Sequence, residues 1–176
     1  SQETWEKAES EMVREAVQTA LQKASLNSKD VEFIFGGDLL NQCIGSTYGL
    51  RDFGIPFVGM YGACSTMALS LAMASVFVDN GLANNAVAVT SSHFCSAERQ
   101  FRFPLEYGGQ RPPTAQWTAT ASGAAVVGTE EVSGMNVYVR EVSMGMIQDL
   151  GITDANNMGA AMAPAAASTI KTYLED

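Results

Sequence analysis

Cys64 is the residue whose surroundings most clearly suggest reactivity. It lies in the segment GACST, residues 62–66, between a stretch expected to form a strand and one expected to form a helix. A thiol at a helix N-terminus faces the positive end of the helix dipole, which lowers its pKa and raises its nucleophilicity. The small residues at 62 and 63 permit the tight turn of a nucleophile elbow. The alternative is a buried packing residue, because free cysteine is among the most buried residue types. Cys43 and Cys95 lack the strand-to-helix context and are predicted to be packing residues.

His93 is the one histidine of the chain, and it follows the apolar segment 86–90. Ligands of open α/β folds collect at the carboxyl edge of a parallel sheet, where this residue is expected. Its imidazole could contact a ligand there or be a hydrogen-bonded structural group. Asp38 and Asn41 follow another expected strand and lie at the same edge if the sheet is parallel. Their alternative role is to cap the short helix that follows.

The segment 91–118 is locally basic, with a charge of +1 in a chain whose net charge is −9. Its charged residues are Arg99, Arg102, Arg111, Glu98 and Glu106. Guanidinium groups suit carboxylates and phosphates, so the segment could bind an anion. The alternative is a solvated loop held by internal arginine–glutamate pairs.

The composition excludes several classes of protein. With 47% hydrophobic and 16% charged residues among 176, the chain is neither disordered, collagen-like nor a coiled coil, and its length suits one domain. The acidic balance argues against duplex nucleic acid and against simple electrostatic adsorption to anionic lipid. Three cysteines without a CxxC pair favour a reducing compartment and, with one histidine, make a zinc site unexpected.

Sequence motifs exclude further functions. The chain contains no Walker loop, GxGxxG, HExxH or GxSxG, so nucleotide-binding, zincin and hydrolase functions lose support. No apolar run approaches the roughly 20 residues of a membrane helix. The polar, helical pattern at the N-terminus also predicts no signal peptide.

Hydropathy patterns predict alternating helices and strands. Helices are expected at 5–24, 41–51, 67–79 and 160–176, and strands at 31–35, 57–60, 86–90, 118–127 and 135–144. Residues 36–38 (GGD) are expected to break the first strand, and 91–116 are expected to form a long lid or binding loop. This alternation is typical of an α/β fold with a sheet packed between helices.

A weak internal similarity suggests two halves. Residues 16–21 (AVQTAL) are similar to residues 166–171 (AASTIK), as if a second copy of the first helix began near the end of the chain. We therefore expect residues 1–159 to form one half and residues 160–176 to open another. On this interpretation the chain is a fragment whose apolar face lacks its partner.

Three segments resemble the thiolase superfamily. They are residues 62–66, the strand 87–90 and residues 121–127 (ASGAAVV), the last similar to the Gly/Ala-rich strand that follows the lid loop in thiolases and ketoacyl synthases. The resemblance implies a thiolase-like half with a central, mixed, mostly parallel sheet between helices. It also implies that the first strand of the fold and the second half, which holds catalytic His or Asn residues, lie outside this sequence.

A finer resemblance is to the stage V sporulation protein AD family, thiolase-like proteins of endospore-forming bacteria. The similar stretches cover nearly the whole chain: 36–42 (GGDLLNQ), 91–93 (SSH), 97–102 (AERQFR), 106–110 (EYGGQ) and 149–164. The resemblance implies a non-enzymatic protein that binds dipicolinic acid (pyridine-2,6-dicarboxylate) and supports its uptake into the developing spore and its release in germination. It implies peripheral attachment to the spore inner membrane beside integral membrane partners.

The expected site and its ligand follow from both lines of argument. The candidate ligand-binding residues are Cys64, His93, Asp38, Asn41, Arg99 and Arg102. Dipicolinate is a dianion, which a chain of charge −9 repels at long range, so local arginines or a calcium ion carried with the ligand would have to compensate. No other cofactor, no protein-bound metal and no nucleic acid is expected. Thiolase relatives imply a homodimer of the complete protein.

Two other functions remain open. In an acyltransferase, Cys64 would form a thioester and the arginine segment would bind an acyl-CoA phosphate. In a structural subunit, the surface would dock membrane proteins and the pocket would be vestigial. The arginine segment fits binding and catalysis equally well.

Overall fold

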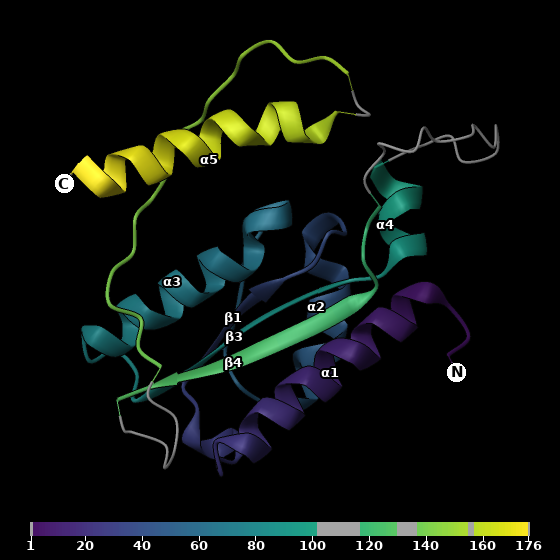
Figure 1. The fold of residues 1–176 in the computed structure, drawn as a ribbon. Coiled ribbons are helices and arrows are strands. Elements are labelled where there is room, and N and C mark those ends of the chain that lie inside the picture. Colours follow the sequence, from purple (N-terminus) through teal and green to yellow (C-terminus); the bar gives the residue numbers. More distant parts are fainter. Residues whose placement is uncertain (1, 102–116, 130–136, 155–156, 176) are drawn as a thin grey trace. The chain divides into compact units, whose positions relative to one another are not determined.

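The computed structural model describes residues 2–101, 117–129, 137–154 and 157–175 (Figure 1). The chain divides into two compact units, one formed by residues 1–106 and 118–137 and the other by residues 107–117 and 138–176. The boundary expected between residues 159 and 160 stays a prediction.

The first unit contains a four-stranded sheet with the order β2-β1-β3-β4. Its strands are β1 (Phe33–Gly37), β2 (Phe57–Gly59), β3 (Asn85–Ser92) and β4 (Ala121–Gly128). Strand β1 pairs in parallel with both β2 and β3, whereas β3 and β4 are antiparallel. The predicted α/β fold with a mixed, mostly parallel sheet is confirmed.

Helix α1 (Trp5–Lys23) covers one face of the sheet (Figure 1). Its buried residues Val13, Val17 and Leu21 recur every four positions and pack against Ile34, Val87 and Val89 of the two central strands. The N-cap Thr4 accepts a hydrogen bond from the Lys7 amide at 3.2 Å, which satisfies one free donor of the first turn.

Helix α2 (Ile44–Leu50) packs closely on α1 and is flanked by two 3₁₀ turns, η2 (Asn41–Cys43) and η3 (Arg51–Phe53). Gly49 lies so close to the Ser10 carbonyl that a side chain there would collide with the backbone. The Ser10 hydroxyl donates to the Gly45 carbonyl at 2.9 Å. These contacts fix α2, and the turn before it, to the first half of α1.

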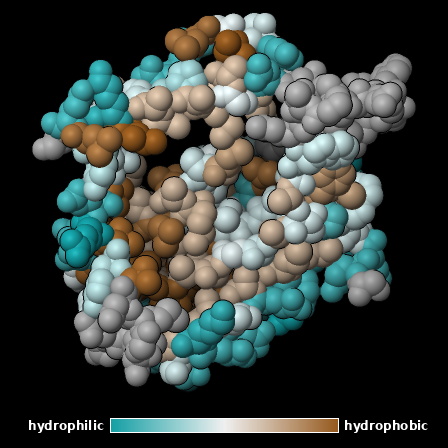
Figure 2. All heavy atoms as spheres, viewed as in Figure 1, coloured by the Kyte–Doolittle hydropathy of each residue, from teal (hydrophilic) through white to brown (hydrophobic). Residues whose placement is uncertain are grey.

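Helix α3 (Thr66–Asp79) covers the opposite face (Figure 1) and packs on Phe35, Ala86 and Ala88. It is apolar on nearly all sides, but Val76 and the following Leu82 are exposed. Figure 2 shows hydrophobic side chains gathered over this helix. Helices of this kind are normally buried all round, so α3 presents an unusually apolar surface.

The structure corrects two expectations about β1 and the segment after β3. Strand β1 continues through Gly36 and Gly37 instead of ending before them, because both glycines approach the neighbouring backbone too closely for a side chain. Helix α4 (Phe94–Phe101) occupies part of the expected loop 91–116. Residues 102–116, the rest of that loop, lie outside the described residues.

The expected strand 135–144 is also corrected. Residues 135 and 136 lie outside the described residues, and residues 137–144 form neither helix nor strand. A strand exists only through its hydrogen-bonded neighbours, and the described sheet pairs none of its strands with this segment. An apolar pattern without a partner therefore stays irregular here.

The second unit contains helix α5 (Met158–Glu175), close to the expected 160–176. The Asn157 side chain accepts from the Ala160 amide at 3.2 Å and caps its first turn. Gln148 donates to the Ser168 hydroxyl at 3.4 Å, which ties the irregular segment before the helix to α5.

Candidate functional site

The carboxyl edge of the parallel strands collects the chemically distinctive residues. Strands β2, β1 and β3 are neighbours and run in the same direction, so their carboxyl ends share one edge of the sheet. Asp38 directly follows β1, His93 directly follows β3, and Cys64 lies in the turn between β2 and α3. Asp38, His93 and the turn of Cys64 thus each follow a strand that ends at this edge. Ligands of α/β folds commonly bind there.

Asp38 is fully buried, and its carboxylate accepts hydrogen bonds from the segment that follows β1. One carboxylate oxygen accepts from the Leu40 amide at 2.8 Å, and the other accepts from the Ser46 amide and hydroxyl, each at 2.7 Å. Ser46 is in the first turn of α2, where backbone donors lack helical partners. The carboxylate thus caps α2 from a distance, which is the alternative role considered for this residue.

Cys64 is exposed, which excludes the buried packing role. It lies in a 3₁₀ turn (Ala63–Ser65) that leads directly into α3. Ala63 has a φ of +48°, an uncommon conformation for a residue with a side chain. The Ser65 hydroxyl donates to the Gly62 carbonyl at 2.8 Å, and the Thr66 hydroxyl donates to the Ala63 carbonyl at 2.9 Å. Two hydroxyls therefore hold a tight, strained turn that presents the thiol to solvent.

His93 connects β3 to α4. Its Nδ1 accepts from the Cys95 amide at 3.2 Å, and its carbonyl accepts from the Ala97 amide at 3.0 Å, so the residue caps α4. The imidazole is half-buried and has a structural hydrogen bond on one nitrogen. Contact with a ligand at the same edge remains a prediction.

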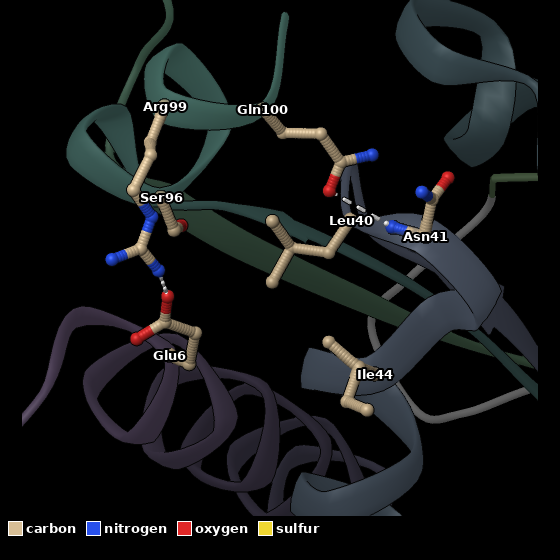
Figure 3. A pocket seen from close by; sticks show the side chains of 7 residues that line it. All are labelled: Glu6, Leu40, Asn41, Ile44, Ser96, Arg99 and Gln100. Carbon is tan, nitrogen blue, oxygen red and sulfur yellow. Dashed lines mark hydrogen bonds and ion pairs between the residues drawn. The ribbon is translucent and has the colours of Figure 1, made fainter. Parts of the chain in front are cut away.

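Asn41 and Arg99 line a common pocket of about 280 Å³ (Figure 3). Its walls come from α1, from α4, from the segment between β1 and α2 and from the first residue of α2. Its lining residues are Glu6, Leu40, Asn41, Ile44, Ser96, Arg99 and Gln100. The Asn41 backbone amide donates to the Gln100 side-chain oxygen at 3.1 Å. This hydrogen bond joins the segments that follow β1 and β3. Cys64, Asp38 and His93 do not line this pocket.

Arg99 is the cation of this pocket. Its guanidinium forms an ion pair with Glu6 and lies over the Trp5 ring, 5.5 Å from the ring centre. The pair joins α4 to α1, unlike the pairs within the segment that the sequence suggested. Arg102, Arg111 and Glu106 lie outside the described residues.

Glu9 is a buried carboxyl that the sequence analysis did not single out. Its two oxygens accept from the hydroxyls of Ser91 and Ser96, each at 2.9 Å. Burial raises the pKa of Glu9 above its ordinary value of 4.5, and the nearby Asp38 charge acts in the same direction. A signal was present in the sequence, because Glu9 is four residues before Val13 in the apolar stripe of α1.

The other two cysteines have different surroundings. Cys43 is buried, as predicted, and its thiol donates to the Met60 carbonyl at 3.4 Å. Burial raises the pKa of the Cys43 thiol, which disfavours the reactive thiolate. Cys95 is half-buried in α4.

A second pocket, of about 330 Å³, lies near the C-terminal end of α1. Arg14, Gln18, Asp52 and Phe53 are among its lining residues, and none of the predicted site residues is. Over the described part of the chain, no three His, Cys, Asp or Glu side chains are placed to hold a metal ion. Within the same residues, no helix has the length and apolar character needed to cross a membrane.

Comparison with known proteins gives one family. The family model described as Stage V sporulation protein AD matches residues 1–176. The chain is 48% identical to Stage V sporulation protein AD of Bacillus subtilis (strain 168) over 176 residues, which are 100% of this chain and 51% of that protein. The chain thus spans about half the length of this curated relative.

Solved structures show a similar fold at low sequence identity. A 3-oxoacyl-(acyl-carrier-protein) synthase III superposes with a TM-score of 0.54 at 13% identity, covering 93% of this chain and 59% of the synthase. The synthase III of Pseudomonas aeruginosa PAO1 has a TM-score of 0.52 at 15% identity, covering 90% and 51%. A priming β-ketosynthase from the R1128 polyketide pathway has a TM-score of 0.52 at 18% identity, covering 74% and 37%. The fold is thiolase-like.

Proposed function

This chain belongs to the stage V sporulation protein AD family, a family of sporulation proteins with a thiolase-like fold, and from this we propose that it is a non-enzymatic binding module for dipicolinic acid. In this proposal it supports dipicolinate uptake into the developing spore and release in germination. It acts as a peripheral protein of the spore inner membrane, beside integral membrane proteins of the same uptake system and as a homodimer when complete.

The observation that carries the proposal is the pocket formed by Asn41, Arg99 and their neighbours at the carboxyl edge. Arg99 has five N–H donors, and one ion pair with Glu6 leaves others for a ligand carboxylate. Leu40 and Ile44 offer apolar contact for a pyridine ring, and Figure 3 shows them between the polar side chains. A volume of about 280 Å³ suits a small ligand.

The net charge of the chain opposes the binding of a dianion, so the site must compensate for it locally. The net charge of −9 repels the ligand at a distance, so affinity must come from local donors or from a calcium ion carried with the ligand. Asp38, His93 and Cys64 follow strands that end at the same edge but do not line this pocket, so their contact with the ligand stays a prediction. Arg102 lies outside the described residues and stays a predicted ligand residue.

Calorimetric titration of the protein with dipicolinate, with and without calcium, tests this function. A charge-assisted hydrogen bond is worth roughly 1.5–3 kcal/mol, so Arg99→Ala should weaken binding about tenfold or more. The matched control is Arg51→Ala, an exposed arginine that also lies over an aromatic ring, 5.7 Å from the centre of Tyr48. Absence of dipicolinate binding, or equal losses in the two variants, would contradict the proposal.

A second candidate function is acyl transfer with Cys64 as the nucleophile. The exposed thiol in a strained turn at the start of α3 favours it. In an enzyme, Cys64→Ser abolishes turnover. In the binding module, the same variant changes dipicolinate affinity less than Arg99→Ala does, because no covalent bond forms.

A further inference from the structure

Glu9 connects three elements that the chain brings together only in the folded state. It lies in the first half of α1. Its carboxyl group accepts hydrogen bonds from Ser91, near the C-terminal end of β3, and from Ser96, in the first turn of α4. All three side chains are buried. Both contacts therefore form away from water, where an unpaired polar group is costly.

The hydroxyls of Ser91 and Ser96 each have an acceptor in either protonation state of Glu9. The Ser96 hydroxyl lies 2.9 Å from Glu9 and 3.0 Å from the His93 carbonyl, and its single proton can go to only one of them. When Glu9 is ionised, both serines donate to it. When Glu9 is protonated, it can donate to Ser96, which then donates to the His93 carbonyl. A glutamine side chain, with one acceptor and one donor group, can reproduce the second arrangement.

The junction adjoins the pocket directly. Ser96 lines the pocket, and Arg99 and Gln100 follow it on the next turn of α4. On α1, Glu6 lies one turn before Glu9 and pairs with Arg99. Asp38 after β1 is the charged group that acts on Glu9, and the Glu6–Arg99 pair lies one turn away along α1 and α4.

We infer that Glu9 is a positioning residue for the pocket, which holds α4 against β3 through Ser91 and Ser96 and so sets the place of Arg99. Glu9 does not contact the ligand. Only the ligand-binding part of this inference rests on the proposed function. The attachment of α4 is a property of the fold alone.

The test compares Glu9→Ala and Glu9→Gln with Val17→Ala, a buried substitution on the same helix far from α4. Two readouts are measured: amide hydrogen exchange of α4 under native conditions, and dipicolinate affinity by calorimetry. In Glu9→Ala we expect α4 amides to exchange about tenfold faster relative to α3 amides. We expect affinity to fall about three- to tenfold, the usual size of such indirect coupling.

Glu9→Gln should restore slow exchange and affinity, because it keeps one donor and one acceptor. Val17→Ala should accelerate exchange throughout the unit without singling out α4. The inference is overturned if α4 in Glu9→Ala behaves as it does in Val17→Ala, or if glutamine rescues nothing. If the wild-type protein binds no dipicolinate, the proposed function fails while the exchange readout still decides the role of Glu9. If Glu9→Ala does not fold, Ser91→Ala provides the same exchange test.

Discussion

Replacing Asp38 with alanine should destabilise the protein severely. Asp38 is 1% exposed and is the acceptor for three donors, at 2.8, 2.7 and 2.7 Å. Each buried donor left without a partner costs about 1–3 kcal/mol, so the three together should lower the free energy of unfolding by about 3–9 kcal/mol. A domain of this kind has roughly 5–15 kcal/mol in total. The substitution should therefore remove a large part of the stability.

Urea unfolding followed by circular dichroism measures this effect. The matched control is Asp52→Ala, because the Asp52 side chain is 73% exposed and its pairing with Arg51 is a surface contact. Exposed pairs contribute little, so the control should change stability by less than about 1 kcal/mol. Ser46→Ala, which removes one of the three donors, should lower the free energy of unfolding by less than Asp38→Ala does. The double variant should lose less stability than the sum of the two single losses, because the two residues are in contact.

A small effect would refute the structural role of Asp38. If Asp38→Ala loses no more stability than Asp52→Ala, the carboxylate is not the cap of α2. If the Asp38→Ala variant keeps its stability but loses dipicolinate affinity, the carboxylate contributes to ligand binding and not to stability. We expect Asp38→Ala to lose both stability and dipicolinate affinity, and its loss of stability should be seen at every ligand concentration.

Three further predictions concern other parts of the chain. Burial raises the pKa of Glu9 above 4.5, so Glu9 should stabilise the protein most, relative to Glu9→Gln, below pH 4.5. This stabilisation should be lost as the pH rises through the raised pKa, which urea unfolding across pH would measure. A difference in stability that is independent of pH would contradict this. Timed alkylation with peptide mapping should modify Cys64 before Cys43 and Cys95, and equal or slower modification of Cys64 would disprove its reactivity. The apolar surface of α3 should make the chain associate at high concentration, and Val76→Lys should reduce that association in sedimentation velocity; a monomer with a concentration-independent melt would exclude it.

Local periodicity was sufficient to predict most of the sheet and its covering helices. The apolar residues of α1 recur at helical spacing, and the continuous apolar run of β3 is typical of a central strand buried on both faces. The gathering of Asp38, Cys64 and His93 at one edge also follows, because parallel strands place their carboxyl ends together. These features depend on patterns within short segments.

Features that depend on distant contacts could not be predicted in the same way. Gly36 and Gly37 suggest a break in the sequence, but they extend β1 because their missing side chains let neighbouring backbone approach. Helix α4 has only eight residues, and its contact with α1 through Ser96 and Glu9 joins residues that lie 87 positions apart. Glu9 lies in the apolar stripe of α1, but the acceptor role of its carboxylate is evident only when α1 packs against Ser91 and Ser96.

Chemical-shift mapping with dipicolinate tests the central claim most directly. The backbone amides of Asn41, Arg99 and Gln100 at the pocket should shift on titration, while those of Gln18 at the second pocket should not. Arg99→Ala should remove the shifts at the ligand concentration that saturates the wild-type protein. Shifts confined to the second pocket, or no shifts at any dipicolinate concentration, would contradict a dipicolinate site at the carboxyl edge of the sheet.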